Sequence, residues 1–350
     1  MVNVDKKSAI SSVAYIFIII TALKFGSGII LPFLMAFFLF IIFLPLANRL
    51  NSFAIPNRVT TLIIFILIAV IVSSIAAFII SSGDDIIKNI PIYQDKFYKV
   101  TPKVIDFFEK FNISLEWKSI ISLIEPAKIV NNITSFFKGM GNVVVNIMLT
   151  LTLVIFLFLE SSTISQKALY FTKTAQQKEK LALVLKSISR YFLIKTFTSL
   201  LTGFLVWIML AYFNLQYALL FAVLAFLLNY IPSIGSFIAS FPALFVAILQ
   251  LNMIDTTIIA IGYVAINMFV GNFLDPKIMG KNLGLSTFIV FTSMVIWGWI
   301  LGPMGMFLAV PLTIAIKIAC ENSVKYNYIA VILTDRLIED KKLKKEGKNL

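Results

Sequence analysis

The sequence predicts an all-α integral membrane protein of about eight transmembrane segments. Two of these are expected to be re-entrant or broken helical hairpins, and a helical extramembrane segment is expected after the third span. Hydrophobic residues make up 59% of the 350 residues and charged residues only 13%, whereas a soluble domain is typically about half apolar and a quarter charged. In addition, residues 271–313 stay apolar although Gly and Pro interrupt them repeatedly. Such breaks are tolerated at membrane depth where protein or a water-filled cavity surrounds them, so they indicate a transport path.

Three apolar runs predict three transmembrane helices within residues 1–80. They are Ser8–Gly28, Ile29–Ala47 and Val59–Ile80. The first run follows Lys6 and Lys7 and therefore also resembles a signal peptide. No small-residue cleavage site follows it, however, and the second run begins almost at once, which favours a transmembrane helix.

Residues 81–141 have a nearly balanced charge, and the alternation of sides places them outside the cytoplasm. Apolar residues recur three and four positions apart from Ile86 to Phe111, which predicts an extracytoplasmic helical segment. Thr101-Pro102 is typical of the start of a new helix within it. Three roles stay open for this stripe: a hairpin packed on itself or on the membrane domain, an oligomer contact, or a binding site for an external partner.

A fourth transmembrane helix is expected at residues 142–160, and a basic connector follows at residues 161–195. We interpret the connector as a cytoplasmic amphipathic helix at the membrane surface, although an ordinary connector explains its pattern as well. The basic C-terminal tail at residues 319–350 is also expected in the cytoplasm, and Lys6 and Lys7 place the N-terminus there too.

Residues 196–318 form the predicted transport core, in which Pro and Gly break two hairpins. The first break, Ile231–Ser236, separates the arms Tyr217–Tyr230 and Phe237–Gln250. Each arm has about 14 residues, or about 21 Å of helix, which is short of the roughly 30 Å hydrocarbon core. A re-entrant hairpin explains both the short arms and the turn residues; one long kinked span is the alternative.

The second hairpin is expected from Leu285–Leu301 and Met306–Lys317, on either side of Gly302-Pro303-Met304-Gly305. The two regions share a short pattern that could also arise by chance: Gly235-Ser-Phe-Ile-Ala239 before Pro242, and Gly305-Met-Phe-Leu-Ala309 before Pro311. The charge count makes the first hairpin enter from outside and the second from inside. This arrangement is typical of inverted-repeat transporters, which bind their substrate between the two halves.

The residue inventory excludes several classes of chemistry. Histidine is absent and Cys320 is the only cysteine, which removes internal disulfides, imidazole or thiolate metal cages and His-dependent nucleophiles. The phosphate-binding pattern GxxxxGK[ST] is missing as well. We therefore expect no enzyme activity, cofactor or metal. The net charge of +13 is concentrated beside hydrophobic runs, which indicates contact with membrane lipid and not with nucleic acid.

Neutral polar groups and helix breaks define the predicted substrate path, because no charged residue occurs between Lys195 and Asp255. Neutral donors and acceptors suit an uncharged polar solute, although interhelical hydrogen bonding explains such residues equally well. Asn229 and Asn272 are the strongest candidates because each lies beside a break. The candidates are Asn229, Pro232, Ser233, Gly235, Ser236, Ser240, Pro242, Asn267, Asn272, Gly302, Pro303, Gly305 and Pro311.

Ion transport would instead need a titratable or cation-binding carboxylate within this core. Asp255 and Asp275 are the only acidic residues between Lys195 and Lys317, so they are the candidates for ion coupling. Asp275 could also simply pair with Lys277 or Lys281 at the membrane surface. The two aspartates are expected near opposite ends of one helix, roughly 30 Å apart, which argues against an intramembrane aspartate protease.

The blocks GNFLDPKIMGKNLGLS, WGWILGPMG, AVPLT and NYIPSIGSFIASFPAL resemble the signature of the autoinducer-2 exporter family, also described as PerM-like or TqsA-like bacterial permeases. The resemblance assigns Pro276, Lys277, Gly280 and Gly284 to the family motif. It implies export or facilitated passage of a small uncharged signal such as autoinducer-2, a quorum-sensing molecule. A multi-pass protein of the bacterial inner membrane that assembles as a homo-oligomer, a pentamer, is implied too. Some relatives are assigned sodium–proton antiport, so that alternative stays open, as does a membrane scaffold.

Overall fold

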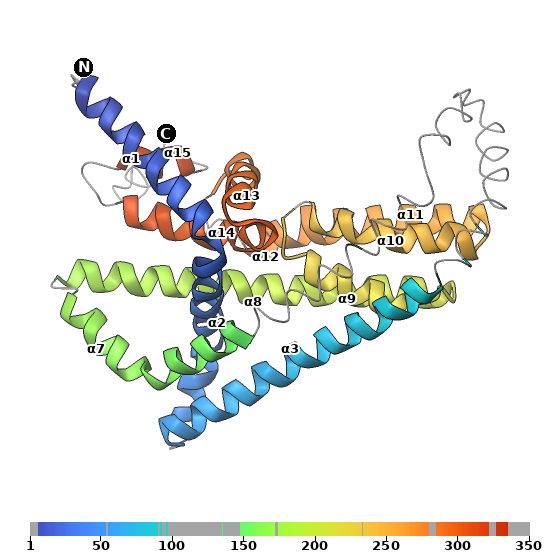
Figure 1. The fold of residues 1–350 in the computed structure, drawn as a ribbon, viewed down its shortest axis with the longest axis horizontal. Coiled ribbons are helices and arrows are strands. Elements are labelled where there is room, and N and C mark those ends of the chain that lie inside the picture. Colours follow the sequence, from blue (N-terminus) through green and yellow to red (C-terminus); the bar gives the residue numbers. More distant parts are fainter. Residues whose placement is uncertain are drawn as a thin grey trace, which may run out of the picture. The chain divides into compact units, whose positions relative to one another are not determined.

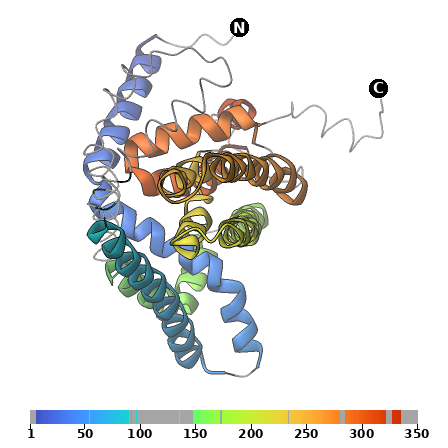
Figure 2. The ribbon, with the colours of Figure 1, turned by 90° about the vertical axis from the view of Figure 1, so that its right-hand side faces the viewer.

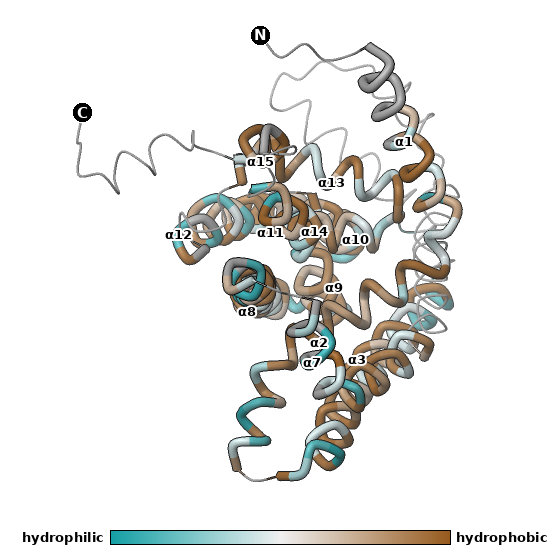
Figure 3. The backbone as a smooth tube through the Cα atoms, turned by 90° about the vertical axis from the view of Figure 1, so that its left-hand side faces the viewer, coloured by the Kyte–Doolittle hydropathy of each residue, from teal (hydrophilic) through white to brown (hydrophobic). Residues whose placement is uncertain are grey.

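The computed structural model describes residues 6–53, 55–89, 148–171, 174–232, 234–279, 285–321 and 327–334, and isolated positions between 90 and 147. These residues are almost all helical; they contain no strand, only an isolated bridge between Leu285 and Thr334. Five of the described helices are long and apolar enough to cross a membrane, and four shorter apolar helices accompany them. Figure 3 shows the hydrophobic colour along most of these helices. An all-α membrane protein is thereby confirmed, while the number of about eight segments stays a prediction.

The chain divides into two compact units, which are described separately. Unit 1 comprises residues 1–65, 149–194 and 279–350, and unit 2 comprises residues 66–148 and 195–278. The two predicted hairpins fall into different units, since the first lies in unit 2 and the second in unit 1. The domain boundaries expected from the sequence remain predictions, and most of the extracytoplasmic segment and of the C-terminal tail lies outside the described residues.

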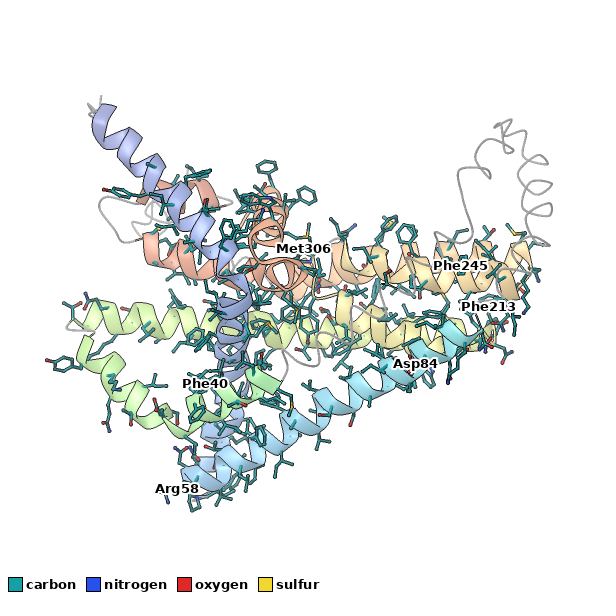
Figure 4. All side chains as sticks on the ribbon, viewed as in Figure 1. Phe40, Arg58, Asp84, Phe213, Phe245 and Met306 are labelled. Atoms are coloured by element: carbon teal, nitrogen blue, oxygen red, sulfur yellow. The ribbon has the colours of Figure 1, made fainter. Side chains whose placement is uncertain are left out.

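In unit 1, α1 (Lys6–Phe25) and α2 (Ser27–Ser52) are separated by Gly26 alone. Hydrogen bonds of helical spacing continue across this joint, from Gly26 N–H to the Ala22 carbonyl at 2.8 Å and from Ile30 N–H to the Gly26 carbonyl at 2.9 Å. The chain therefore bends at Gly26 and does not turn back, as Figure 1 also shows. The next helix, α3 (Asn57–Lys88), begins after a short turn, and Arg58 in Figure 4 marks that end.

Aromatic side chains pack the middle of unit 1. The Phe40 ring of α2 lies 4.8 Å from that of Phe158 on the helix Met148–Leu159, with the two rings edge to face. Phe192, which is fully buried, contacts Phe38 of α2 and Phe307. Phe192 belongs to α8 (Ala175–Tyr212), which follows α7 (Ser161–Phe171) and continues into unit 2 from residue 195.

The second predicted break is confirmed as a tight reversal between α13 (Thr287–Leu301) and α14 (Pro303–Glu321). Gly302 joins them with φ 73° and ψ −160°, a conformation essentially restricted to glycine. A Cβ at Gly305 would overlap the Trp297 carbonyl, so glycine permits the close approach of the two helices. Met306, labelled in Figure 4, fills the space beside Gly298. Residues 327–333 form the short helix α15, which packs on α14.

Unit 2 contains the first predicted hairpin, α9 (Ala218–Leu228) and α10 (Gly235–Gln250), followed by α11 (Met253–Asn267). Figure 2 looks nearly along these helices, and α10 packs against both α9 and α11. The break at residues 229–234 is confirmed; a Cβ at Gly235 would overlap the Leu228 carbonyl, so the turn needs glycine. A common core joins these helices to the ends of α3 and α8, with Phe213 and Phe245 at its edge in Figure 4.

Candidate functional site

Four buried polar residues form a stripe along α8 inside unit 2, which we call the α8 polar seam. They are Lys195, Thr198, Ser199 and Thr202, and each is at most 4% exposed. Their spacing of three, one and three residues places them on one face of the helix. Apart from Thr196, which is half-buried, the side chains around these four are apolar. Leu200, Phe204 and Ile208 are exposed, as lipid-facing side chains would be. The seam therefore brings polar groups into the interior of unit 2.

The break between α9 and α10 supplies direct partners to this part of α8. The buried amide of Asn229 donates from Nδ2 to Ser199 Oγ over 3.0 Å, and the hydroxyl of Tyr230 donates to Thr196 Oγ1 over 2.7 Å. The hydroxyls of Thr198 and Thr202 donate to carbonyls one turn back on α8 itself. Thus a sequence-predicted site residue, Asn229, contacts the seam, and neutral amide and hydroxyl groups make the contact.

Asp275 contacts the other end of the seam, at Lys195. Its Oδ2 lies 2.8 Å from Lys195 Nζ, and both side chains are buried. The expected pairing with Lys277 is wrong, because the Lys277 ammonium lies 5.3 Å from the centre of the Phe273 ring, and Lys281 lies outside the described residues. A buried charge needs a partner of opposite sign, and Lys195 provides it. The second carboxylate oxygen, Oδ1, is buried without a hydrogen-bond partner.

The helix leading to Asp275 has an unusual backbone. After α11 the chain forms a π-helix, η1 (Met268–Leu274), before α12 (Asp275–Met279). The N–H of Asp275 donates to the carbonyl of Val270, five residues back. The next donor in this pattern would serve Gly271, but residue 276 is proline and has no N–H. The Gly271 carbonyl is therefore left without its intrahelical donor, one turn before the unpartnered Oδ1.

Asp255, the other ion-coupling candidate, has a clear local role. Its N–H donates to Asn252 Oδ1 over 2.8 Å, and Asn252 Nδ2 donates to Asp255 Oδ2 over 2.7 Å. Asn252 is thus the N-cap of α11, and Asp255 lies in the first turn, where a negative charge is stabilised by the helix dipole. The contacts of Asp255 are accounted for by helix capping.

The remaining path candidates are dispersed. In unit 2, the Ser240 hydroxyl donates to the carbonyl of Phe237 on its own helix, Asn267 is half-buried and Asn272 is exposed. Pro232, Ser236 and Pro242 are half-buried and line the turn or helix α10, while Gly302, Pro303, Gly305 and Pro311 belong to unit 1. Ser233, Gly280 and Gly284 lie outside the described residues. Among the described residues, no cluster of three acidic or cysteine side chains could hold a metal ion.

The α8 polar seam was not among the sequence-predicted site residues. Lys195 stands at the end of the predicted cytoplasmic connector, and the three hydroxyl residues after it stand in the predicted transport core but not among its candidates. A signal was nevertheless present: polar residues at positions 195, 198, 199 and 202 recur on one helical face within an apolar run. A polar stripe in a membrane helix is expected to face the protein interior.

Comparison with known proteins gives a consistent result. The profile of the AI-2E family of transporters matches residues 13–325 of this chain. A Haemophilus influenzae protein named as a transport protein is 35% identical over 97% of this chain and 99% of its own length. The AI-2 transport protein TqsA of Escherichia coli is 32% identical over 91% of this chain and 93% of its own length. YhhT of Escherichia coli, also named as a transport protein, is 29% identical over 91% of this chain.

Proposed function

The chain belongs to the AI-2E transporter family, and on that premise we propose that it moves a small, uncharged polar solute such as autoinducer-2 across the membrane. The buried hydrogen bond between Asn229 and Ser199 carries this proposal, because it places neutral donors and acceptors at a helix break inside unit 2. Interrupted helices are where membrane transporters bind their substrates. The name of the relative TqsA, an AI-2 transport protein, supports the choice of solute.

Charge compensation within unit 2 favours a neutral solute. Lys195 and Asp275 neutralise each other at 2.8 Å, and the other side chains of the seam are hydroxyls. Among the described residues of the seam and its partners, an ionic solute would therefore meet no uncompensated charge of opposite sign. Its transfer out of water would cost far more than that of a neutral solute. A polyhydroxylated neutral solute could exchange its hydrogen bonds with water for bonds to the amide and hydroxyl groups.

Sodium–proton antiport, the alternative, finds less support in the environment of Asp275. Lys195 already compensates the charge of the Asp275 carboxylate, so a sodium ion on Oδ1 would be repelled by the neighbouring ammonium. Asp255 is engaged in capping α11. A scaffold role gives no reason for the two helix breaks, between α9 and α10 and between α13 and α14. The two broken hairpins are proposed as re-entrant segments of an inverted repeat, and a homo-oligomer in the bacterial inner membrane remains part of the proposal.

Transport by the purified full-length protein in proteoliposomes tests the proposal. We expect time-dependent passage of autoinducer-2 that depends on the protein and is unchanged when sodium is replaced by choline. A pH-sensitive dye inside the same vesicles reports antiport. Sodium-driven proton movement without passage of autoinducer-2 would favour the antiporter, and no movement of either would favour the scaffold.

A further inference from the structure

We propose that the Gly271 carbonyl and Asp275 Oδ1 form a two-acceptor subsite for hydroxyl groups of a neutral solute. The inference rests on the proposed function and deepens it, because it specifies a hydrogen-bond donor as the recognised group. Both residues belong to unit 2 and are one helical turn apart along the chain, at the junction of η1 and α12.

The Gly271 carbonyl has no N–H donor from the following turn, and Asp275 Oδ1 has no hydrogen-bond partner. The N–H of Asp275 donates to the carbonyl of Val270, and Pro276 has no N–H, so neither residue donates to the Gly271 carbonyl. Asp275 is only 9% exposed, and its Oδ1 is buried without a hydrogen-bond partner. A carbonyl without its helical donor and a buried carboxylate oxygen without a partner are both costly in a membrane, so their occurrence one turn apart on the same helix points to a ligand.

The surroundings favour a neutral hydroxylated ligand. Lys195 is bound to Oδ2 and compensates the carboxylate charge, so a cation on Oδ1 would meet the ammonium at close range. A hydroxyl group donates to either acceptor without that repulsion, and its bond to the carboxylate is charge-assisted. A Cβ added to Gly271 would meet no atom within 4 Å, so the space beside the α-carbon of this residue is open.

The burial of Oδ1 implies that the subsite is closed in this conformation. Transporters bind substrate between states that open to opposite faces of the membrane. The π-helix is suited to such opening, because π-helical turns inside α-helices are frequent at functional sites. The hydroxyl groups of the solute would then donate to the Gly271 carbonyl and to Asp275 Oδ1.

The substitution Pro276→Ala tests the subsite, because it restores an N–H that can donate to the Gly271 carbonyl. It leaves the charge of the protein unchanged. Ligand affinity of the purified full-length protein is measured from the rise in thermal unfolding temperature with autoinducer-2 and with ribitol as probes. We expect binding to weaken about three- to tenfold, as for the loss of one hydrogen bond. Pro45→Ala, the same change at an exposed proline within α2, is the matched control and should leave affinity unchanged.

A second variant keeps the proposal testable if Pro276→Ala does not fold. Lys195→Met combined with Asp275→Met removes Oδ1 without stranding a charge and should reduce affinity more than tenfold. Unchanged affinity in either folded variant overturns the subsite, as does a wild-type protein that binds neither probe. A cation site would be indicated instead if sodium chloride raised the unfolding temperature of the wild type more than choline chloride did, and if this difference disappeared in Pro276→Ala. That result would overturn the subsite. Passage of autoinducer-2 in proteoliposomes, measured separately, shows whether the proposed function fails with the subsite or stands without it.

Discussion

Lys195 and Asp275 form a buried ion pair in unit 2, with Lys195 Nζ 2.8 Å from Asp275 Oδ2. Desolvation of two ions offsets much of their attraction, so the pair itself adds little net stability. Loss of one partner is different, because it leaves the other charge buried and uncompensated. The pair is therefore a sensitive point, and single and double substitutions should behave very differently.

We predict that Asp275→Met alone lowers the free energy of unfolding by about 3–5 kcal/mol, because it strands the Lys195 ammonium. The double variant Lys195→Met with Asp275→Met should recover most of this loss. Reversible unfolding in mixed micelles measures both. A double variant no more stable than Asp275→Met would contradict the pairing.

The hydrogen bond from Asn229 to Ser199 should show direct coupling. In a double-mutant cycle with Asn229→Leu and Ser199→Ala, we predict a coupling energy of about 0.6–1.7 kcal/mol, the range of interhelical hydrogen bonds in membranes. The unfolding free energies of the four proteins give the value. Strict additivity would show that the two side chains do not interact.

The sequence predicted one of the buried polar contacts of unit 2 but not the other. Asn229 was predicted because it precedes Pro232 at a visible break. Lys195 was missed as a partner of Asp275 because 80 positions separate them, and lysines nearer in the chain offered a simpler pairing. Local charge patterns show where a carboxylate lies along a helix, but only tertiary packing decides which distant cation reaches it.

At the scale of helices, the breaks were the most predictable feature. Pro232 with Gly235, and Gly302 with Gly305, stop the helices because proline lacks an N–H and glycine permits close approach. Both breaks occur where the sequence placed them. The π-helix was not predicted, because its hydrogen-bond shift arises from packing around residues 268–274 and has no distinctive composition.

Gly302 should be the least replaceable residue of the second turn. We predict that Gly302→Ala costs about 1–3 kcal/mol of unfolding free energy, because φ 73° with ψ −160° is unfavourable for a residue with a Cβ. Gly28→Ala is the matched control: Gly28 lies within α2, and an added Cβ would meet nothing there within 4 Å. Equal effects of the two substitutions would argue against the observed geometry at Gly302.

For the whole molecule, membrane orientation follows from the charge distribution. In a Cys320→Ser background, we predict that Ser52→Cys is labelled by an impermeant maleimide only from the cytoplasmic side and Gln216→Cys only from the outside. Both positions are exposed. Labelling of both from one side would overturn the predicted topology, including the opposite entry of the two hairpins.

The joint at Gly26 decides whether the chain reverses its direction between α1 and α2. Apolar run length identified α1 and α2 as helices, but it cannot tell a bend from a reversal. That distinction depends on the backbone at one residue, and Gly26 (φ −82°, ψ 2°) continues the helical hydrogen bonding. The all-helical membrane class was thus predictable from composition, whereas the path of the N-terminal helices was not.

The most direct test of the account is the initial rate of autoinducer-2 passage in proteoliposomes that contain wild-type, Asn229→Leu or Ser293→Ala protein. Ser293 is the control, since its buried hydroxyl donates only to a carbonyl of its own helix, Val290, over 2.8 Å. We predict rapid passage with the wild type and Ser293→Ala, and at least tenfold slower passage with Asn229→Leu, about 1.4 kcal/mol. Equal rates for all three proteins would contradict a path along the α8 polar seam.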